Sequence, residues 1–268
     1  MRLGIGSYTF AWAVGIPEQM PERPMTARGL LDKARALEVS VVQIADNMSL
    51  HELPVSEIEA LQEGATDLVI ELGCRGIHPD HLDTYVRLAE LLGSRVLRVV
   101  VDTDDHHPPE DEIVSSLREF VPHLEKASVV LAIENHDRFR ASALARIIER
   151  IGSDHVGVCL DTVNSFGALE GPQVVVDALV PYVVNLHVKD FVVERASHLK
   201  GFSIEGRPAG QGQLDIPWLL GRLNDQGINV NAILELWVSP ETTLAETIAK
   251  EDAWAVDSVA YLRRFIAD

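Results

Sequence analysis

The sequence contains little cysteine and fewer basic than acidic residues. Among 268 residues there are 2 cysteines, 23 lysines and arginines and 41 aspartates and glutamates, for a formal net charge of -18. Cys74 and Cys159 lie in apolar runs without CxxC spacing, so we expect buried thiols in a reducing compartment rather than a disulfide framework. The acidic balance argues against nucleic acid and anionic membranes as partners, because both repel a negatively charged protein.

Long hydrophobic runs are also missing. No stretch approaches the roughly 20 apolar residues of a membrane span, and the first residues lack the apolar core of a signal peptide. We therefore expect a cytoplasmic protein without a membrane partner. Hydrophobic residues make up 47% and charged residues 24% of the chain, which is ordinary globular usage and excludes disordered and collagen-like classes.

Short β-branched runs alternate with longer amphipathic stretches, as expected when each parallel strand is followed by a covering helix. Strand character is found in residues 3–6, 41–45, 68–72, 96–101, 129–134, 156–161, 183–188 and 232–236. Helical character is found in residues 26–37, 79–92, 111–126, 141–151, 172–179, 216–226 and 245–266.

This alternation predicts the fold class. Near-continuous apolar strands are buried on both faces, and eight successive β-then-α units favour closure into a barrel. We therefore predict an α/β protein with a single (β/α)8 barrel, the TIM barrel, forming one domain over residues 1–268. The longest irregular stretch, 191–213, is rich in glycine and follows the seventh strand, so we expect a functional loop over the barrel mouth.

Four consecutive strands, the fifth to the eighth, each end in a residue that can bind a metal. These residues are Glu134, Asp161, His187 and Glu235. In a barrel the carboxyl ends of all strands meet at one face, where active sites lie, so these side chains should converge. One such residue alone is explained more simply by a salt bridge or a helix cap, but four on adjacent strands favour a shared site.

The chemistry of these four residues points to one divalent cation. Three buried carboxylates repel one another and resist ionisation unless a cation joins them. Three carboxylates and one imidazole form an oxygen-rich ligand set that suits Mn²⁺ or Mg²⁺, with Co²⁺ as a substitute, better than structural zinc.

Five segments carry a resemblance to a known family. They read IENH (133–136), GVCLDT (157–162), LHVKD (186–190), GQGQLD (210–215) and LELW (234–237). Together they resemble the xylose-isomerase-like family of sugar isomerases and epimerases over nearly the whole chain. The resemblance implies that Glu134, Asp161, His187 and Glu235 bind the metal, and that Glu134 and Glu235 also exchange the substrate proton as catalytic residues.

The chain departs from the family's ketose 3-epimerases at two positions. Those enzymes usually have a histidine three residues after the aspartate that matches Asp161, and an arginine after the metal histidine. Here the matching residues are Asn164 and Val193. Asn164 can bind a substrate oxygen but cannot carry a proton. The opening segment 4–15 resembles the family's branch of 3-oxo-isoapionate decarboxylases.

Six residues are expected to contact substrate at the same barrel face. They are Tyr8, Asp46, His136, Asn164, Lys189 and Arg207. His136 and Lys189 each lie two residues beyond a predicted ligand, so strand alternation places them on the same side, and Arg207 lies in the glycine-rich loop. Ordinary turn residues or rim salt bridges are the simpler explanation for each. By contrast, Glu71 and Arg98 on neighbouring strands are expected to form an internal ion pair.

These observations predict a metal-dependent enzyme that acts on a small keto sugar or keto sugar acid through an enediolate. An isomerase or epimerase is the simplest reaction. The alternative is a carboxy-lyase, because loss of carbon dioxide from a 3-oxo sugar acid leaves the same type of enolate while Lys189 or an arginine orients the carboxylate. A homo-oligomer is left open.

Two further classes fit less well. A metal-dependent repair endonuclease needs more metal ligands and a basic groove, which this acidic chain lacks. A non-catalytic sugar-binding protein would not need two glutamates flanking one metal.

Overall fold

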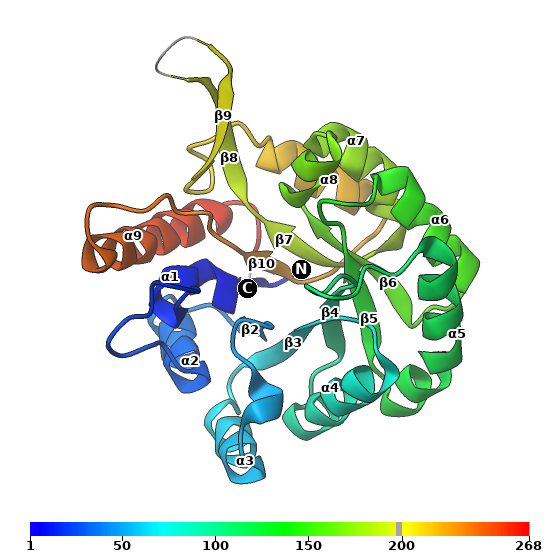
Figure 1. Ribbon diagram of the computed structural model, residues 1–268. Helices are drawn as coiled ribbons and strands as arrows, with labels where there is room; N and C mark the ends of the chain where they lie inside the picture. Colours follow the sequence, from blue (N-terminus) through cyan, green and yellow to red (C-terminus); the bar gives the residue numbers. More distant parts are fainter. Residues whose placement is uncertain (197–199, 268) are drawn as a thin grey trace.

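The computed structural model describes residues 1–196 and 200–267. Eight parallel strands close into a barrel in the order β1-β10-β7-β6-β5-β4-β3-β2, surrounded by helices (Figure 1). The barrel strands are β1 Leu3–Gly6, β2 Val41–Ile44, β3 Val69–Arg75, β4 Val96–Val100, β5 Val130–Glu134, β6 Val156–Asp161, β7 Val183–Val188 and β10 Ala232–Leu234. The predicted α/β barrel is thus confirmed.

The α-helices follow the strands around the barrel. They are α1 Ala11–Val14, α2 Ala27–Ala36, α3 Val55–Gly64, α4 Pro79–Leu92, α5 Glu110–Ala127, α6 Ala141–Ile151, α7 Pro172–Leu179, α8 Ile216–Asp225 and α9 Leu244–Leu262. Short 3-10 helices are η1 Ser7–Phe10, η2 Leu50–Glu52, η3 Asn164–Ala168 and η4 Val180–Tyr182. No helix in the described ranges is long and apolar enough to cross a membrane.

Alternation along the strands separates an apolar layer from a polar interior. Leu72 and Leu97 belong to one apolar cluster that also contains Leu82 of α4 and Leu117 of α5. Their neighbours in the strands, such as Glu71 and Arg98, are polar and also buried. Because successive strand residues point to opposite faces, the apolar side chains pack beneath the helices and the polar ones fill the barrel. The barrel interior can therefore hold a charged site.

The stretch 191–213 is not irregular throughout, and this expectation was wrong. β8 Asp190–Arg195 and β9 Phe202–Arg207 form an antiparallel two-stranded sheet. Figure 1 shows β8 and β9 projecting away from the helices that surround the barrel, so these two strands do not cover the mouth; residues 197–199 of the stretch lie outside the described residues. The base of the hairpin does reach the rim, since a Cβ on Gly206 would lie 1.9 Å from the carbonyl oxygen of Trp237.

The glycine-rich segment after β9 is a turn built around one carboxylate. Asp190 Oδ2 accepts hydrogen bonds from the backbone N–H groups of Gly210 (2.8 Å) and Gly212 (3.0 Å), and Oδ1 accepts one from Leu214 (3.0 Å). A Cβ on Gly212 would lie 2.2 Å from Asp190 Oδ1, so only glycine permits this approach. The turn leads the chain into α8.

Candidate metal centre

The structure brings Glu134, Asp161, His187 and Glu235 together inside the carboxyl end of the barrel. They come from the ends of β5 and β6, from β7, and from the residue after β10, and all four are buried. His187 Nδ1 lies 3.4 Å from Glu134 Oε2, 3.8 Å from Asp161 Oδ2 and 3.2 Å from Glu235 Oε1. One imidazole nitrogen therefore faces three carboxylates.

Three atoms of this cluster are buried without a hydrogen-bond partner. They are His187 Nδ1, Asp161 Oδ2 and Glu235 Oε1, although Asp161 Oδ2 also has an ionic contact with Lys189. Buried polar atoms without partners are rare and costly, and three that face one another form a natural position for a cation. Asp161, His187 and Glu235 offer ligand atoms within 4.8 Å of one another. The residues present fit one divalent ion with oxygen and nitrogen ligands.

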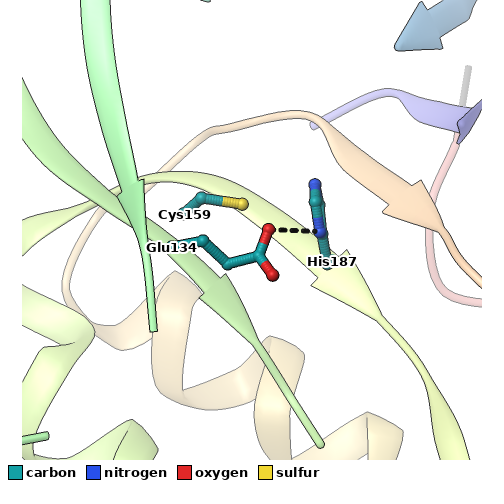
Figure 2. Close-up of side chains that lie close together, drawn as sticks. All are labelled: Glu134, Cys159 and His187. Atoms are coloured by element: carbon teal, nitrogen blue, oxygen red, sulfur yellow. Dashed lines mark ion pairs between the residues drawn. The ribbon is translucent and has the colours of Figure 1, made fainter. Parts of the chain in front are cut away.

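Cys159 lies next to this cluster and was not among the predicted ligands. Figure 2 shows its side chain beside Glu134 and His187, and the ligand atoms of the three lie within 4.8 Å of one another. Burial raises the pKa of the Cys159 thiol well above its usual range. The thiol of Cys159 donates a hydrogen bond to Asn185 Oδ1, with 3.4 Å between Sγ and Oδ1. Because its S–H group is directed at Asn185, Cys159 lies in the wall of the site.

Arg98 neutralises Glu134 from the barrel wall. Its Nε donates to Glu134 Oε2, and its Nη1 lies 2.6 Å from Asp46 Oδ1. The expected ion pair between Arg98 and Glu71 is therefore wrong. Burial opposes ionisation of Glu134, but the guanidinium of Arg98 and the ammonium group of Lys189 help to hold the pKa of Glu134 well below its usual range.

Lys189 lies on the same side of the chain as His187, as strand alternation predicted. Its Nζ is 2.8 Å from both Asp161 Oδ2 and Glu235 Oε2, and its side chain is 15% exposed. Burial alone would lower the pKa of Lys189, but the carboxylates of Asp161 and Glu235 raise the pKa above its usual value. Lys189 is thus an ammonium group paired with two carboxylates of the cluster.

Asn164 occupies the start of η3, directly after β6. Asp161 Oδ1 accepts hydrogen bonds from the backbone N–H groups of Val163 and Asn164, both at 2.8 Å. This local turn aims the Asn164 side chain back into the barrel, where Nδ2 donates to Glu134 Oε1 at 2.6 Å. Asn164 therefore binds one of the predicted metal ligands directly.

A cavity of about 390 Å³ opens onto the site. It is lined by Tyr8, Ala11, Asp137, Val163, Asn164, Phe166, Gly167, Lys189, Glu235, Leu236 and Trp237. A larger depression of about 600 Å³ lies at α2 and α3, outside the barrel, and contains none of the predicted site residues. The smaller cavity is therefore the one positioned for chemistry.

Tyr8 and Asp46 are connected to the site through Arg98. Tyr8 Oη donates to Asp46 Oδ2 at 3.0 Å, and Tyr8 lines the cavity. Burial and the Asp46 charge raise the pKa of Tyr8, so its hydroxyl stays protonated. Burial opposes ionisation of Asp46, but Arg98 and Arg75 lower its pKa.

His136 and Arg207 lie farther out. His136 Nδ1 is 3.3 Å from Asp137 Oδ2, with a side chain 32% exposed. Arg207, in the hairpin, pairs with Glu194 at 3.2 Å and Glu205 at 3.4 Å. Neither residue lines the cavity, and their contact with substrate stays a prediction.

A polar layer beneath the cluster was missed by sequence reasoning. Gln43 Oε1 lies 2.7 Å from His187 Nε2, and Gln43 Nε2 donates to Glu71 and Asn185. Glu71 is buried; burial raises its pKa, and hydrogen bonds from Asn231, Asn185 and Gln43 oppose that rise. The sequence signal that could have identified this layer is the presence of polar residues, such as Gln43 and Asn185, in otherwise apolar strands.

The fold and site define a class: a (β/α)8 barrel whose carboxyl end gathers three acids and a histidine, residue types that could hold a cation. Residues 75–265 match the family described as xylose isomerase-like TIM barrel. The chain belongs to this family.

One curated relative covers almost the entire chain. The 3-oxo-isoapionate decarboxylase of Pectobacterium atrosepticum is 33% identical over 98% of this chain and 95% of its own length. The sequence identity to this relative is higher than the identity to the two solved structures described next.

Solved structures share the fold. A D-psicose 3-epimerase determined in the presence of D-fructose has a TM-score of 0.76 at 15% identity and covers 100% of both chains. A xylose isomerase-like TIM barrel protein from Mycobacterium smegmatis in complex with magnesium has a TM-score of 0.70 at 14% identity, covering 97% of each chain.

Proposed function

We propose that this protein is a divalent-metal-dependent carboxy-lyase that acts on a 3-oxo sugar acid, such as 3-oxo-isoapionate. The observation that carries the proposal is Lys189, whose ammonium group lies between the cavity and the carboxylates of Asp161 and Glu235. This ammonium group would attract a substrate carboxylate. Similarity to the Pectobacterium atrosepticum decarboxylase over 98% of the chain supports the same reaction.

Glu134, Asp161, His187 and Glu235 would hold one Mn²⁺ or Mg²⁺ ion, with Co²⁺ as a substitute. When bound, a divalent cation supplies Lewis-acid stabilisation of negative charge developing on a substrate oxygen. We also propose that the chain works as one domain over residues 1–268 in the cytoplasm.

The charges around the site favour an anionic substrate once a cation is present. The acids Asp46, Glu134, Asp161 and Glu235 are paired with the cations Arg75, Arg98 and Lys189. This set carries one excess negative charge, and a divalent ion changes it to one excess positive charge. A substrate carboxylate or a developing enediolate would balance that charge in a site of low dielectric constant.

The residues then have separate tasks in decarboxylation. The bond between the carboxylate carbon and the adjacent carbon breaks, carbon dioxide leaves, and the bonding electron pair moves onto the 3-oxo group as an enediolate. Lys189 orients the carboxylate before cleavage. The hydroxyl of Tyr8, which donates its hydrogen to Asp46, would accept a hydrogen bond from a substrate hydroxyl group. Glu235, which lines the cavity, relays the proton that the carbon takes up afterwards.

A second candidate is a ketose isomerase or epimerase, which sequence reasoning favoured. Glu134 and Glu235 both belong to the cluster, and such reactions use an acid and a base. However, both oxygens of Glu134 already accept hydrogen bonds, from Arg98 and Asn164, and Glu134 does not line the cavity. Glu235 is then the one carboxylate of this pair that is available to transfer a proton. This suits decarboxylation, which needs one proton donor, better than epimerisation, which needs an acid and a base.

The two candidates are separated by incubating Mn²⁺-loaded enzyme in deuterated water with 3-oxo-isoapionate and, separately, with a panel of ketoses. We expect carbon dioxide release from the 3-oxo acid and deuterium in the product. Deuterium exchange or epimer formation in a ketose, without gas release from the 3-oxo acid, would replace the carboxy-lyase with the isomerase or epimerase.

A further inference from the structure

We propose that Gln43 is a positioning residue that holds His187 as the Nε2-protonated tautomer, and that Nδ1 is therefore the atom of His187 that binds the metal. Glu71 and Asn185 fix the orientation of Gln43. This inference rests on the metal dependence of the proposed function, but it holds whichever reaction the enzyme catalyses.

The hydrogen-bond network that orients His187 begins at Glu71, a buried carboxyl group beneath the proposed metal ligands. Its Oε2 accepts hydrogen bonds from Asn185 Nδ2 at 2.8 Å and from Gln43 Nε2 at 3.2 Å, and its Oε1 accepts one from Asn231 Nδ2 at 2.7 Å. A carboxylate offers only acceptors. With Glu71 ionised, all three amide groups turn their NH₂ ends toward it.

Gln43 connects Glu71 to His187. With its NH₂ group directed to Glu71 and to Asn185 Oδ1 (3.0 Å), its carbonyl oxygen faces His187 Nε2 at 2.7 Å. A carbonyl oxygen accepts and cannot donate, so Nε2 must carry the hydrogen. Nδ1 of a neutral imidazole then has a free lone pair, and it points at Glu134, Asp161 and Glu235.

The reverse orientation of Gln43 is disfavoured by two contacts. It would place the amide oxygen of Gln43 against Glu71 Oε2 and against Asn185 Oδ1, so acceptors would face acceptors in a buried layer. Asn185 is itself held, because its Oδ1 also accepts from Cys159 Sγ at 3.4 Å. An imidazole with hydrogen on Nδ1 would direct an N–H group at the metal position, where it cannot act as a ligand.

The first test uses the unmodified, metal-free protein. Long-range ¹H–¹⁵N correlation spectra of ¹⁵N-histidine-labelled enzyme report the tautomer of each ring, and His187→Gln assigns the signal of His187. We expect the Nε2-protonated form. A spectrum of His187 with hydrogen on Nδ1 would overturn the proposal without any dependence on activity.

The second test measures Mn²⁺ affinity by calorimetry and by electron paramagnetic resonance. Gln43→Met removes the acceptor while keeping a similar volume, and we expect about a tenfold to hundredfold loss of affinity, the usual effect of removing a partner of a ligating histidine. Asn231→Leu is the control, since it removes one donor to Glu71 but leaves the Gln43–His187 bond intact, and its affinity should stay within about threefold.

Unchanged Mn²⁺ affinity in Gln43→Met, or an equal loss in Asn231→Leu, would contradict a specific role for Gln43. If Gln43→Met does not fold, the tautomer measurement on the unmodified protein decides alone. A correct tautomer with no Mn²⁺ binding by the parent protein would instead refute the metal-dependent function and the ligand role of Nδ1.

Discussion

Asn164 Nδ2 donates a 2.6 Å hydrogen bond to Glu134 Oε1, while Arg98 Nε donates to the other oxygen of the same carboxylate. Glu134 is thus held from two sides, by a side chain that follows β6 and by one from β4. This arrangement keeps the carboxylate ionised and fixed in place, which suits a metal ligand better than a mobile proton acceptor.

Substitutions of Asn164 test the role of its hydrogen bond. In Asn164→Ala we expect kcat/KM for carbon dioxide release to fall about tenfold, because a hydrogen bond to a charged group contributes about 1.5 kcal/mol. In Asn164→Asp a second carboxylate faces Glu134, and we expect at least a hundredfold loss. An Asn164→Asp variant more active than Asn164→Ala would show that Glu134 does not need a donor there.

Isosteric changes of the two glutamates test the site as a whole. We expect Glu134→Gln and Glu235→Gln each to remove turnover by at least about a hundredfold, since each variant loses a charged ligand and Glu235→Gln also loses the proton relay. Circular dichroism should show both variants folded. Retained turnover in both folded variants would exclude the enediolate scheme.

Lys189 provides a test of substrate charge. In Lys189→Met we expect kcat/KM for the 3-oxo acid to fall at least about a hundredfold, because both the orienting cation and the partner of Asp161 and Glu235 are lost. Lys33→Met is the matched control: Lys33 pairs with Asp252 away from the site, and its activity should be unchanged. Equal activities of the two variants would remove Lys189 from the mechanism.

Much of the site followed from the positions of ionisable residues in the strands. Parallel strands in a barrel share one carboxyl face, so Glu134, Asp161, His187 and Glu235 had to approach one another. Alternation also predicted the side on which Lys189 lies. These inferences need only strand direction and a period of two, which the sequence contains.

The pairing of Arg98 depends on the strand register, which sequence patterns do not specify. In the β3–β4 pair Gly73 lies opposite Arg98, whereas in the β2–β3 pair Gln43 lies opposite Glu71. Arg98 therefore starts two residues closer to the carboxyl end than Glu71 does, and it reaches upward to Glu134. A shift of register by two residues would leave the alternation of all strands unchanged.

The hairpin was missed for a different reason. The glycines in 191–213 suggested an irregular loop, but Phe202–Arg207 pairs with Asp190–Arg195 along a complete antiparallel ladder. Gly206 and Gly212 allow close contacts with Trp237 and Asp190 rather than a loose chain. Composition alone does not distinguish these two uses of glycine.

Glu251 gives a prediction for stability against pH. Glu251 accepts hydrogen bonds from the backbone N–H groups of Trp12 and Ala13, and burial raises its pKa to about 7 from 4.5. The folded state then binds more protons than the unfolded state between these values, so the contribution of Glu251 to the free energy of unfolding falls as pH rises from about 4.5 to 7, by up to about 3 kcal/mol.

Urea unfolding of the parent protein and of Glu251→Gln across this pH range measures that contribution. The difference in unfolding free energy between the two proteins should change in favour of the variant as pH rises. A difference that is constant with pH would mean that Glu251 has an ordinary pKa in the folded protein.

Anomalous diffraction from crystals soaked in Mn²⁺ tests the central claim most directly. We predict one strong anomalous peak within coordination distance of Glu134, Asp161, Glu235 and the Nδ1 atom of His187. A peak elsewhere, or none at a saturating Mn²⁺ concentration, would contradict the account.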